Sequence, residues 1–402
     1  IPVLPTTGIF KGHLGPDTYG SSYSHDDEVA KAGYHKVVLK DYAITAELTT
    51  TNRVGFHRYT YPKSNDSYII FDFTTVLGSS ETQSSKVNKA NDHRIEGEVT
   101  MAATIRRPKP ITVYFVAEFD KPFSTFGGWK KGVVIPTLSS LEGEKTGVFV
   151  KFNTTQGEKR LMKVSISYVS VEEAQNNMKS ELPAWNFDEI VKESAQNWDA
   201  MLGRIDVEGG TKVQQQRFYT DLFHALQGRR IVSDVSGTYI DNTGIAPLKK
   251  QVKLDANGKP KFNMYNSDSF WGAQWSLNTL WHLVYPEITE EFINCMLQMY
   301  DDGGLIPRGP SGGNYTYVMT GAATTPFITS AYLKGIKGFD INKAYEGMRK
   351  DHFPGGMMSK AGYEHTTFKG GGIEEYMDLG YVPFPLTPIK YGFHQDGAAQ
   401  TL

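Results

Sequence analysis

The amino-acid sequence predicts an α+β multidomain protein, in which an antiparallel β-sandwich is followed by helices arranged as an α/α toroid. Three observations support this prediction. The chain has 402 residues, which at about 150 residues per domain corresponds to two or three domains. Apolar residues recur with a period of two in the first part of the chain and with a helical period in the second. Long loops rich in glycine and proline separate the predicted helices and favour a toroid over a compact bundle.

The region from Gly33 to about Val171 is predicted to form successive antiparallel strands. It is rich in β-branched and aromatic residues and is broken by turn-forming stretches at 64–66 (SND) and 127–128 (GG). Half-buried strands of this kind close naturally as a β-sandwich. The clearest predicted strands cover residues 35–39, 42–48, 68–73, 111–117 and 164–169.

Past Glu172 the apolar pattern becomes that of amphipathic helices. One helix face is predicted between Phe187 and Leu202, and others follow at 218–226, 277–284, 292–297 and 328–332. The pair Leu182-Pro183 interrupts the pattern before the first long helix, because the residue before a proline disfavours helical backbone. The predicted organisation is therefore a β-sandwich domain at 1–182, a helical linker at 183–230 and the first part of a toroid domain at 231–402.

Composition and charge exclude several classes of function. With 42 Lys and Arg against 44 Asp and Glu, the net charge of −2 leaves no basic excess for binding nucleic acid. No apolar stretch approaches the roughly 18 residues of a membrane-spanning helix, so we expect neither a nucleic-acid nor a membrane partner. The single cysteine, Cys295, excludes a disulfide-stapled scaffold. Phosphate-loop and HExxH zinc motifs are absent from the sequence, which disfavours nucleotide hydrolysis and zinc proteolysis.

The densest cluster of candidate site residues lies between Tyr265 and Trp281. There, Asp268 precedes a predicted helix on which Trp271 and Trp275, spaced by four, share a face. One acid and two indoles can hold a sugar, because the C–H face of a pyranose stacks on aromatic rings and its hydroxyls bond to polar groups. The alternative interpretation is a helix N-cap followed by two core tryptophans.

A second candidate is the glycine-rich loop at 303–320, which carries Arg308 and Tyr315. Loops this long inside a compact domain are usually functional or disordered, and the aromatic content favours function. We also considered the cluster at 25–28 (HDDE) as a metal site, but it lacks the oxygen-ligand spacing of a calcium loop.

Several motifs in order along the chain resemble glycoside hydrolase family 92. They are YSHDDE at 23–28, AELTTTNRVGFHRYTYP at 46–62, FYTDLFH at 218–224, SDVSG at 233–237, YPE at 285–287, YVM at 317–319, KGI at 334–336 and GYVP at 380–383. Each motif alone is weak, but the ordered series is specific and covers nearly the whole chain.

The resemblance implies a calcium-dependent exo-α-mannosidase with an N-terminal β-sandwich, a helical linker and an (α/α)6 toroid, whose active site lies between the two domains. It also implies an inverting mechanism, in which one carboxylic acid protonates the leaving oxygen and a carboxylate base activates water on the opposite face of the sugar. The two carboxyl groups are then about 6.5–9.5 Å apart, which leaves room for the water. Calcium would bind sugar hydroxyls. A periplasmic or secreted location is implied by the resemblance alone.

The sequence departs from the family pattern at three positions. Where the family has a Trp-Asp pair that binds sugar, this chain has Trp271-Gly272, and the arginine expected three residues later is Trp275. A glutamate usually occupies the position of Tyr315. Asp268 is a candidate replacement for the missing acid. The sugar contacts predicted for this chain are therefore Asp268, Trp271, Trp275, Arg308 and Tyr315.

The segments that carry the family's general acid, its base and most of its calcium ligands have no match in the sequence. We therefore expect no catalytic residue in these 402 residues, and we expect a further segment or a second chain to complete the toroid. The chain would then supply the substrate platform and be inactive alone. Two alternatives remain open: a non-catalytic glycan-binding protein, and an exo-glycosidase that acts on a different sugar.

Overall fold

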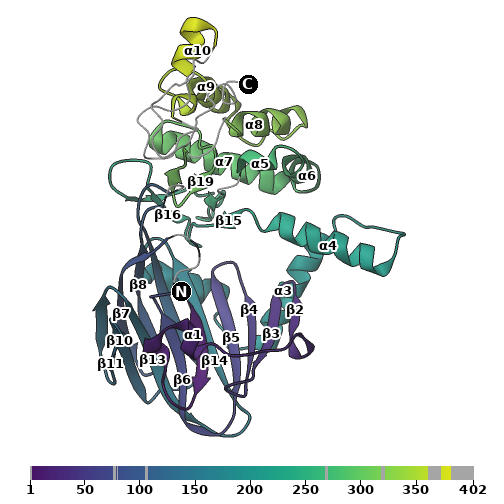
Figure 1. Cartoon of the computed structure of the whole chain (residues 1–402). Coiled ribbons are helices and arrows are strands. Elements are labelled where there is room, and N and C mark those ends of the chain that lie inside the picture. The colour runs from purple at the N-terminus through teal and green to yellow at the C-terminus, as the bar shows by residue number, and fades with distance from the viewer. Residues whose placement is uncertain are drawn as a thin grey trace. The chain divides into compact units, whose positions relative to one another are not determined.

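The computed structural model describes residues 2–75, 78, 80–104, 107–267, 270–317, 322–360 and 373–381, without the side chain of Trp271. Contacts between Cα atoms divide the chain into two compact units. The first comprises Ile1–Ala102 and Pro110–Gly203, and the second comprises Ala103–Lys109 and Arg204–Leu402. Strands dominate the first unit and helices the second (Figure 1).

The first unit is an antiparallel β-sandwich, as the period-two pattern predicts. One sheet has five strands in the order β1-β6-β13-β10-β11, and the other has nine in the order β12-β7-β8-β9-β14-β5-β4-β3-β2. The five-stranded sheet consists of β1 (Val3–Thr7), β6 (Ser64–Asp72), β10 (Thr125–Lys130), β11 (Val133–Ile135) and β13 (Thr146–Thr154). The nine-stranded sheet consists of β2 (Val29–Lys31), β3 (Tyr34–Leu39), β4 (Ile44–Thr50), β5 (Val54–Tyr61), β7 (Thr82–Asn91), β8 (Arg94–Met101), β9 (Ile111–Phe119), β12 (Ser140–Gly143) and β14 (Glu158–Ser167).

The two sheets bury one apolar core between them. Phe71 of β6 and Val148 of β13 pack in the same cluster as Ile95 of β8 and Phe115 of β9, and all four side chains are fully buried. Because side chains alternate across a strand, the neighbour of Phe115, Val116, points to the opposite face of the nine-stranded sheet. That face therefore needs a cover of its own.

Two helices, α2 (Val171–Glu181) and α3 (Phe187–Leu202), cover this second face of the nine-stranded sheet. Ser170 caps α2 by accepting a hydrogen bond from the backbone N–H of Glu173. Met178 and Phe187 pack with Phe56 and Val116 of the sheet. The helix α2 ends immediately before Leu182-Pro183, the pair that interrupts the apolar pattern in the sequence, and the segment predicted as a linker is divided between the two units.

The second unit is built from helices and short strand pairs. Its helices are α4 (Lys212–Leu226), α5 (Phe270–Ala273), α6 (Leu277–Val284), α7 (Pro286–Gly303), α8 (Thr324–Leu333), α9 (Ile341–Asp351) and α10 (Ile373–Leu379). The strand pairs are β15 (Arg230–Ile231) with β18 (Tyr265–Asn266), β16 (Thr238–Asp241) with β17 (Leu248–Gln251), and β19 (Pro310–Ser311) with β20 (Asn314–Tyr315).

The helix α7 is the centre of the second unit's core. Its Phe292, Ile293 and Met296 are fully buried and pack in one cluster with Phe327 of α8 and Ala344 of α9. Pro286 starts the helix, and Gly304 ends it with φ of 81°, a backbone conformation that glycine adopts without strain. None of the helices that the structure describes combines the length and the apolar character needed to cross a bilayer.

Candidate functional site

The two segments singled out in the sequence lie next to each other in the second unit. The backbone N–H of Ser267, after β18, donates to the carbonyl of Pro310 in β19 at 2.8 Å. The N–H of Gly312 donates to Oδ1 of Asn266 at 2.8 Å. The cluster that begins at Tyr265 is thus joined to the loop that carries Arg308 and Tyr315.

Phe270 anchors the start of α5 in the core. Its ring centroid lies 5.6 Å from that of Phe292 and 5.1 Å from that of Phe327, and the side chain is 2% exposed. This buried ring fixes the position of the following residues, which include Trp271 and Gly272.

The expectation that Trp271 and Trp275 share one helix face is wrong. The helix α5 ends at Ala273 and α6 begins at Leu277, so Trp275 lies in the turn between them. Gly272 weakens the helix here, because glycine has a low helix propensity. Trp275 is 79% exposed, so it is not a core residue. Asp268 and the side chain of Trp271 lie outside the described residues.

Arg308 is buried in the segment between α7 and β19. It is only 3% exposed, and burial lowers the pKa of its guanidinium to about 10. The side chain therefore remains cationic at neutral pH. Its predicted contact with a sugar stays a prediction.

Tyr315 uses its hydroxyl inside the protein. The hydroxyl accepts a hydrogen bond from the N–H of Leu305 at 3.2 Å, and the carbonyls of Met299 and Leu305 lie 2.9 and 3.0 Å away as acceptors for its proton. The side chain is 5% exposed, and burial raises its pKa well above the usual value. These contacts hold the end of α7 against the following loop, and they favour a structural role for Tyr315.

We expect Tyr315→Phe to lower the free energy of unfolding by about 1–3 kcal/mol, because buried backbone groups lose their partner. Chemical denaturation would measure this loss. Tyr345→Phe is the matched control, because Tyr345 is 66% exposed. If Tyr315→Phe leaves stability unchanged but weakens sugar binding, then Tyr315 is a ligand contact and not a structural one.

Sequence reasoning missed a partly buried arginine, Arg229, which lies between α4 and β15. Its guanidinium carbon lies 4.3 Å from the ring centroid of Trp281, 4.5 Å from that of Phe292 and 5.1 Å from that of Phe327. Nη1 has no hydrogen-bond partner within the described part of the chain. Burial lowers the pKa of Arg229 to about 9, so the group keeps its charge at neutral pH.

Two further buried polar residues, Asn278 and His282, lie on α6 beside this arginine. They are spaced by four and so share one face of the helix. The amide atoms of Asn278 and both ring nitrogens of His282 lack a hydrogen-bond partner among the residues described, although the backbone of Phe327 is a polar neighbour of the imidazole. Burial, followed by the positive charges of Lys334 and Arg229, lowers the pKa of His282 to about 4. The sequence signal for these two residues is the spacing of Asn278 and His282 by four in a mostly apolar helix.

Asp351, at the end of α9, is another buried titratable group near the loop. It is 1% exposed, and burial raises the pKa of its carboxyl to about 8. The backbone N–H groups of Ile306 and Met357 favour the charged form but do not offset burial. The carboxyl is therefore largely protonated at neutral pH in the folded protein.

We expect stability to fall as pH rises from about 4 to about 8 through Asp351, because the unfolded chain loses this proton near pH 4 and the folded chain only near pH 8. Asp351→Asn removes this titration. The variant should match the wild type in stability at pH 4 and exceed it by a few kcal/mol at pH 8. Urea denaturation across this range checks the prediction, with the exposed Asp378→Asn as control. An unchanged pH dependence in Asp351→Asn would show that burial does not hold this proton.

The described residues do not provide a calcium site of acidic and histidine ligands. Nowhere in the described ranges do three His, Cys, Asp or Glu side chains gather so that they could hold a metal ion. In the 25–28 cluster, the carboxylate of Glu28 instead pairs with Nδ1 of His25 at 2.5 Å and with Nε2 of His35 at 2.9 Å. Calcium binding by this chain therefore stays a prediction from the resemblance.

Comparison with protein families matches both units. The N-terminal domain of glycosyl hydrolase family 92 matches residues 1–167, and the catalytic domain of the same family matches residues 173–402. No curated protein sequence matches the chain significantly.

Solved structures match over almost the entire chain. The family GH92 α-mannosidase BT3965 from Bacteroides thetaiotaomicron is 28% identical, with a TM-score of 0.83 over 96% of this chain and 50% of that protein. The family GH92 inverting mannosidase BT2199 from Bacteroides thetaiotaomicron VPI-5482 has the same fold, with 22% identity and a TM-score of 0.81 over 96% of this chain and 49% of that protein. The chain thus spans about half the length of the structures it resembles.

Proposed function

The chain belongs to glycosyl hydrolase family 92, and from this membership we propose that it supplies the substrate platform of an exo-α-mannosidase that acts on glycans. The observation that carries the proposal is the match of the family's catalytic domain to residues 173–402. The 28% identity with an α-mannosidase over 96% of the chain supports mannose as the sugar.

The proposed reaction is inverting hydrolysis assisted by calcium, outside the cytoplasm. In such a reaction a general acid and a general base stand on opposite sides of the sugar, with room for one water molecule between the base and the anomeric carbon. We assign neither carboxylate to this chain. Calcium would bind sugar hydroxyls through oxygen ligands, and we expect those ligands mostly outside these residues.

The role proposed for this chain is to hold the sugar. Trp275 offers an exposed indole face in the turn between α5 and α6, and such a face suits the C–H side of a pyranose. Asp268, Trp271 and Arg308 complete the proposed contacts, and Tyr315 supports the loop from within. A Cβ at Gly272 would meet no atom within 4 Å, so the backbone there leaves room beside the proposed platform.

A non-catalytic glycan-binding protein is the second candidate, and the replaced acid at Gly272 favours it. The two candidates agree that this chain binds sugar without releasing it. They differ in whether the chain acts together with catalytic carboxylates supplied from outside these residues. An exo-glycosidase for a different sugar is distinguished by the identity of the sugar that binds.

We expect the 402-residue chain to bind methyl α-mannoside and to release no mannose from 4-nitrophenyl α-mannoside. Calorimetry measures the binding, and absorbance of nitrophenol measures the release. A parallel panel of methyl and aryl α-glucosides and α-galactosides tests the sugar. Mannose release that stops on addition of a chelator would show that the catalytic carboxylates lie within this chain. Preference for another sugar would overturn the mannosidase assignment.

Replacement of the exposed indole in Trp275→Ala should weaken binding of methyl α-mannoside roughly tenfold, which corresponds to the loss of one stacking contact. Stability should change by less than about 0.5 kcal/mol, because the side chain is 79% exposed. Tyr345→Ala, at a side chain that is 66% exposed, is the control for loss of a surface aromatic. Equal affinity in the wild type and Trp275→Ala would remove Trp275 from the platform.

A further inference from the structure

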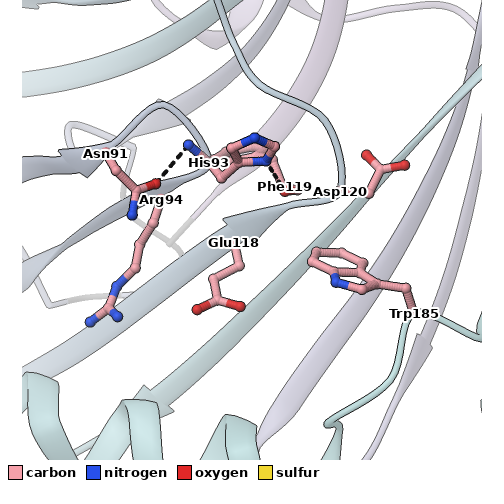
Figure 2. A pocket seen from close by; sticks show the side chains of 7 residues that line it. All are labelled: Asn91, His93, Arg94, Glu118, Phe119, Asp120 and Trp185. Atoms are coloured by element: carbon pink, nitrogen blue, oxygen red, sulfur yellow. Dashed lines mark hydrogen bonds between the residues drawn. The ribbon is translucent and has the colours of Figure 1, made fainter.

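A pocket of about 290 Å³ lies in the first unit, and none of the residues that line it belongs to the proposed platform. Figure 2 shows the side chains that line it: Asn91, His93, Arg94, Glu118, Phe119, Asp120 and Trp185. They come from the β7–β8 hairpin, from the end of β9 and from the segment between α2 and α3. The volume is near the lower limit for ligand pockets, which is about 300 Å³, and suits a single small ring.

The register of the nine-stranded sheet places the pocket's charged side chains in one row. Arg94 of β8 is the Cα partner of Glu118 in β9, and Glu118 is the partner of Lys163 in β14. Directly paired residues project from the same face of an antiparallel sheet. Lys163 in turn pairs with Phe56, which packs against Phe187 at the start of α3. The row therefore lies on the face that α2 and α3 cover in part.

Trp185 is held in place at one end of this row. The Nζ of Lys163 lies 4.1 Å from the centroid of the indole and donates to the carbonyl of Leu182 at 2.8 Å. The ring of Phe56 meets the indole edge at a centroid distance of 6.0 Å. Trp185 nevertheless keeps 36% of its surface exposed. An indole that is held by Lys163 and Phe56 and is still partly exposed to solvent is a preorganised stacking surface.

Beside the indole, the pocket presents hydrogen-bonding groups that the described residues leave unused. Neither oxygen of Glu118 has a hydrogen-bond or ion-pair partner among them, although Glu118 is a charged neighbour of the buried Lys163. Oδ1 of Asp120 accepts from the N–H of Leu161 at 2.9 Å, and the backbone of Lys121 also bonds this carboxylate. Arg94 bonds Glu96 through Nη2 at 2.5 Å, its Nε is buried, and its Nη1 makes no hydrogen bond within the described part of the chain. In Figure 2, Glu118 lies between Arg94 and Trp185.

His93 also lines the pocket, and the hydrogen bond of its Nδ1 determines whether its Nε2 can accept a hydrogen bond. Its Nδ1 lies 3.0 Å from the carbonyl of Phe119 and so must be the protonated nitrogen. In the neutral ring, Nε2 is then an acceptor. The lining thus combines two carboxylates with one guanidinium and one neutral imidazole, which is a formal excess of one negative charge. Such a lining disfavours a phosphate, and its carboxylate acceptors suit the hydroxyl donors of a neutral sugar.

We propose that this pocket is a second carbohydrate site, which binds one neutral pyranose ring of a glycan. The C–H face of the ring stacks on Trp185, and its hydroxyls donate to Glu118 and Asp120 and accept from Arg94. The site would hold a glycan on the sandwich independently of the platform in the second unit. The proposal rests on the proposed function only for the choice of mannosides as probes.

Affinity electrophoresis of the 402-residue chain through a gel that contains α-mannan tests this proposal, with methyl α-mannoside as the soluble competitor. Trp185→Ala and Glu118→Gln are compared with Trp275→Ala and with the wild type. Glu118→Gln keeps the shape of a side chain that makes no internal hydrogen bond among the described residues, so it should fold even if Trp185→Ala does not.

We expect Trp185→Ala to raise the dissociation constant of one mannan-binding component roughly tenfold and Glu118→Gln to raise it several-fold. Trp275→Ala should leave that component unchanged. Wild-type retardation in both Trp185→Ala and Glu118→Gln would overturn the second site, whatever happens to Trp275→Ala. Absence of any retardation of the wild-type chain would also overturn it. Loss of binding in Trp275→Ala alone would support the proposed function and reject the second site.

Discussion

Hydrogen bonds between β18 and the loop after α7 are the constraint on which the second unit's candidate site depends. The loop has almost no regular structure of its own, yet much of it is buried, and buried backbone groups must find partners. The N–H of Ser267 and the side chain of Asn266 provide two of them, and the hydroxyl of Tyr315 serves others at the end of α7. These bonds fix Asn266 and Ser267 against the loop that carries Arg308 and Tyr315.

The sequence was informative wherever local periodicity decided the structure. The strand pattern between Gly33 and Val171 became a sandwich, because alternation of buried and exposed residues specifies which face of each strand enters the core. The helical faces of α3 and α7 followed from apolar spacing, and Leu182-Pro183 marked the end of α2. The same pattern could not predict that Trp271 and Trp275 fall on different elements, since one glycine and one short turn decide that outcome.

Residues whose surroundings come from distant parts of the chain were beyond sequence reasoning. The guanidinium of Arg229 is surrounded by three rings from α6, α7 and α8, and no local sequence pattern predicts that these rings meet there. The place of Tyr315 in a glycine-rich loop predicts a sugar contact, whereas in the structure its hydroxyl bonds the backbone. Likewise, Trp185 gained its fixed position from Lys163, a residue of another strand. The aromatic residues of a sequence indicate that stacking surfaces exist, but only tertiary contacts decide which rings remain exposed to a ligand.

Each unit encloses a basic side chain, Arg229 in the second unit and Lys163 in the first, and the two have different surroundings. In the second unit, the aromatic rings around Arg229 compensate in part for lost hydration, so the guanidinium stays charged while His282 beside it is neutral. Asp351 keeps its proton in the folded protein below pH 7, whereas the unfolded chain loses that proton near pH 4, so stability falls with rising pH in this range. In the first unit, Lys163 is buried too, but it satisfies the carbonyls of Leu182 and Pro183 and supports an indole. Arg229 is thus surrounded by aromatic rings, whereas Lys163 supports the indole of Trp185, which remains partly exposed to solvent.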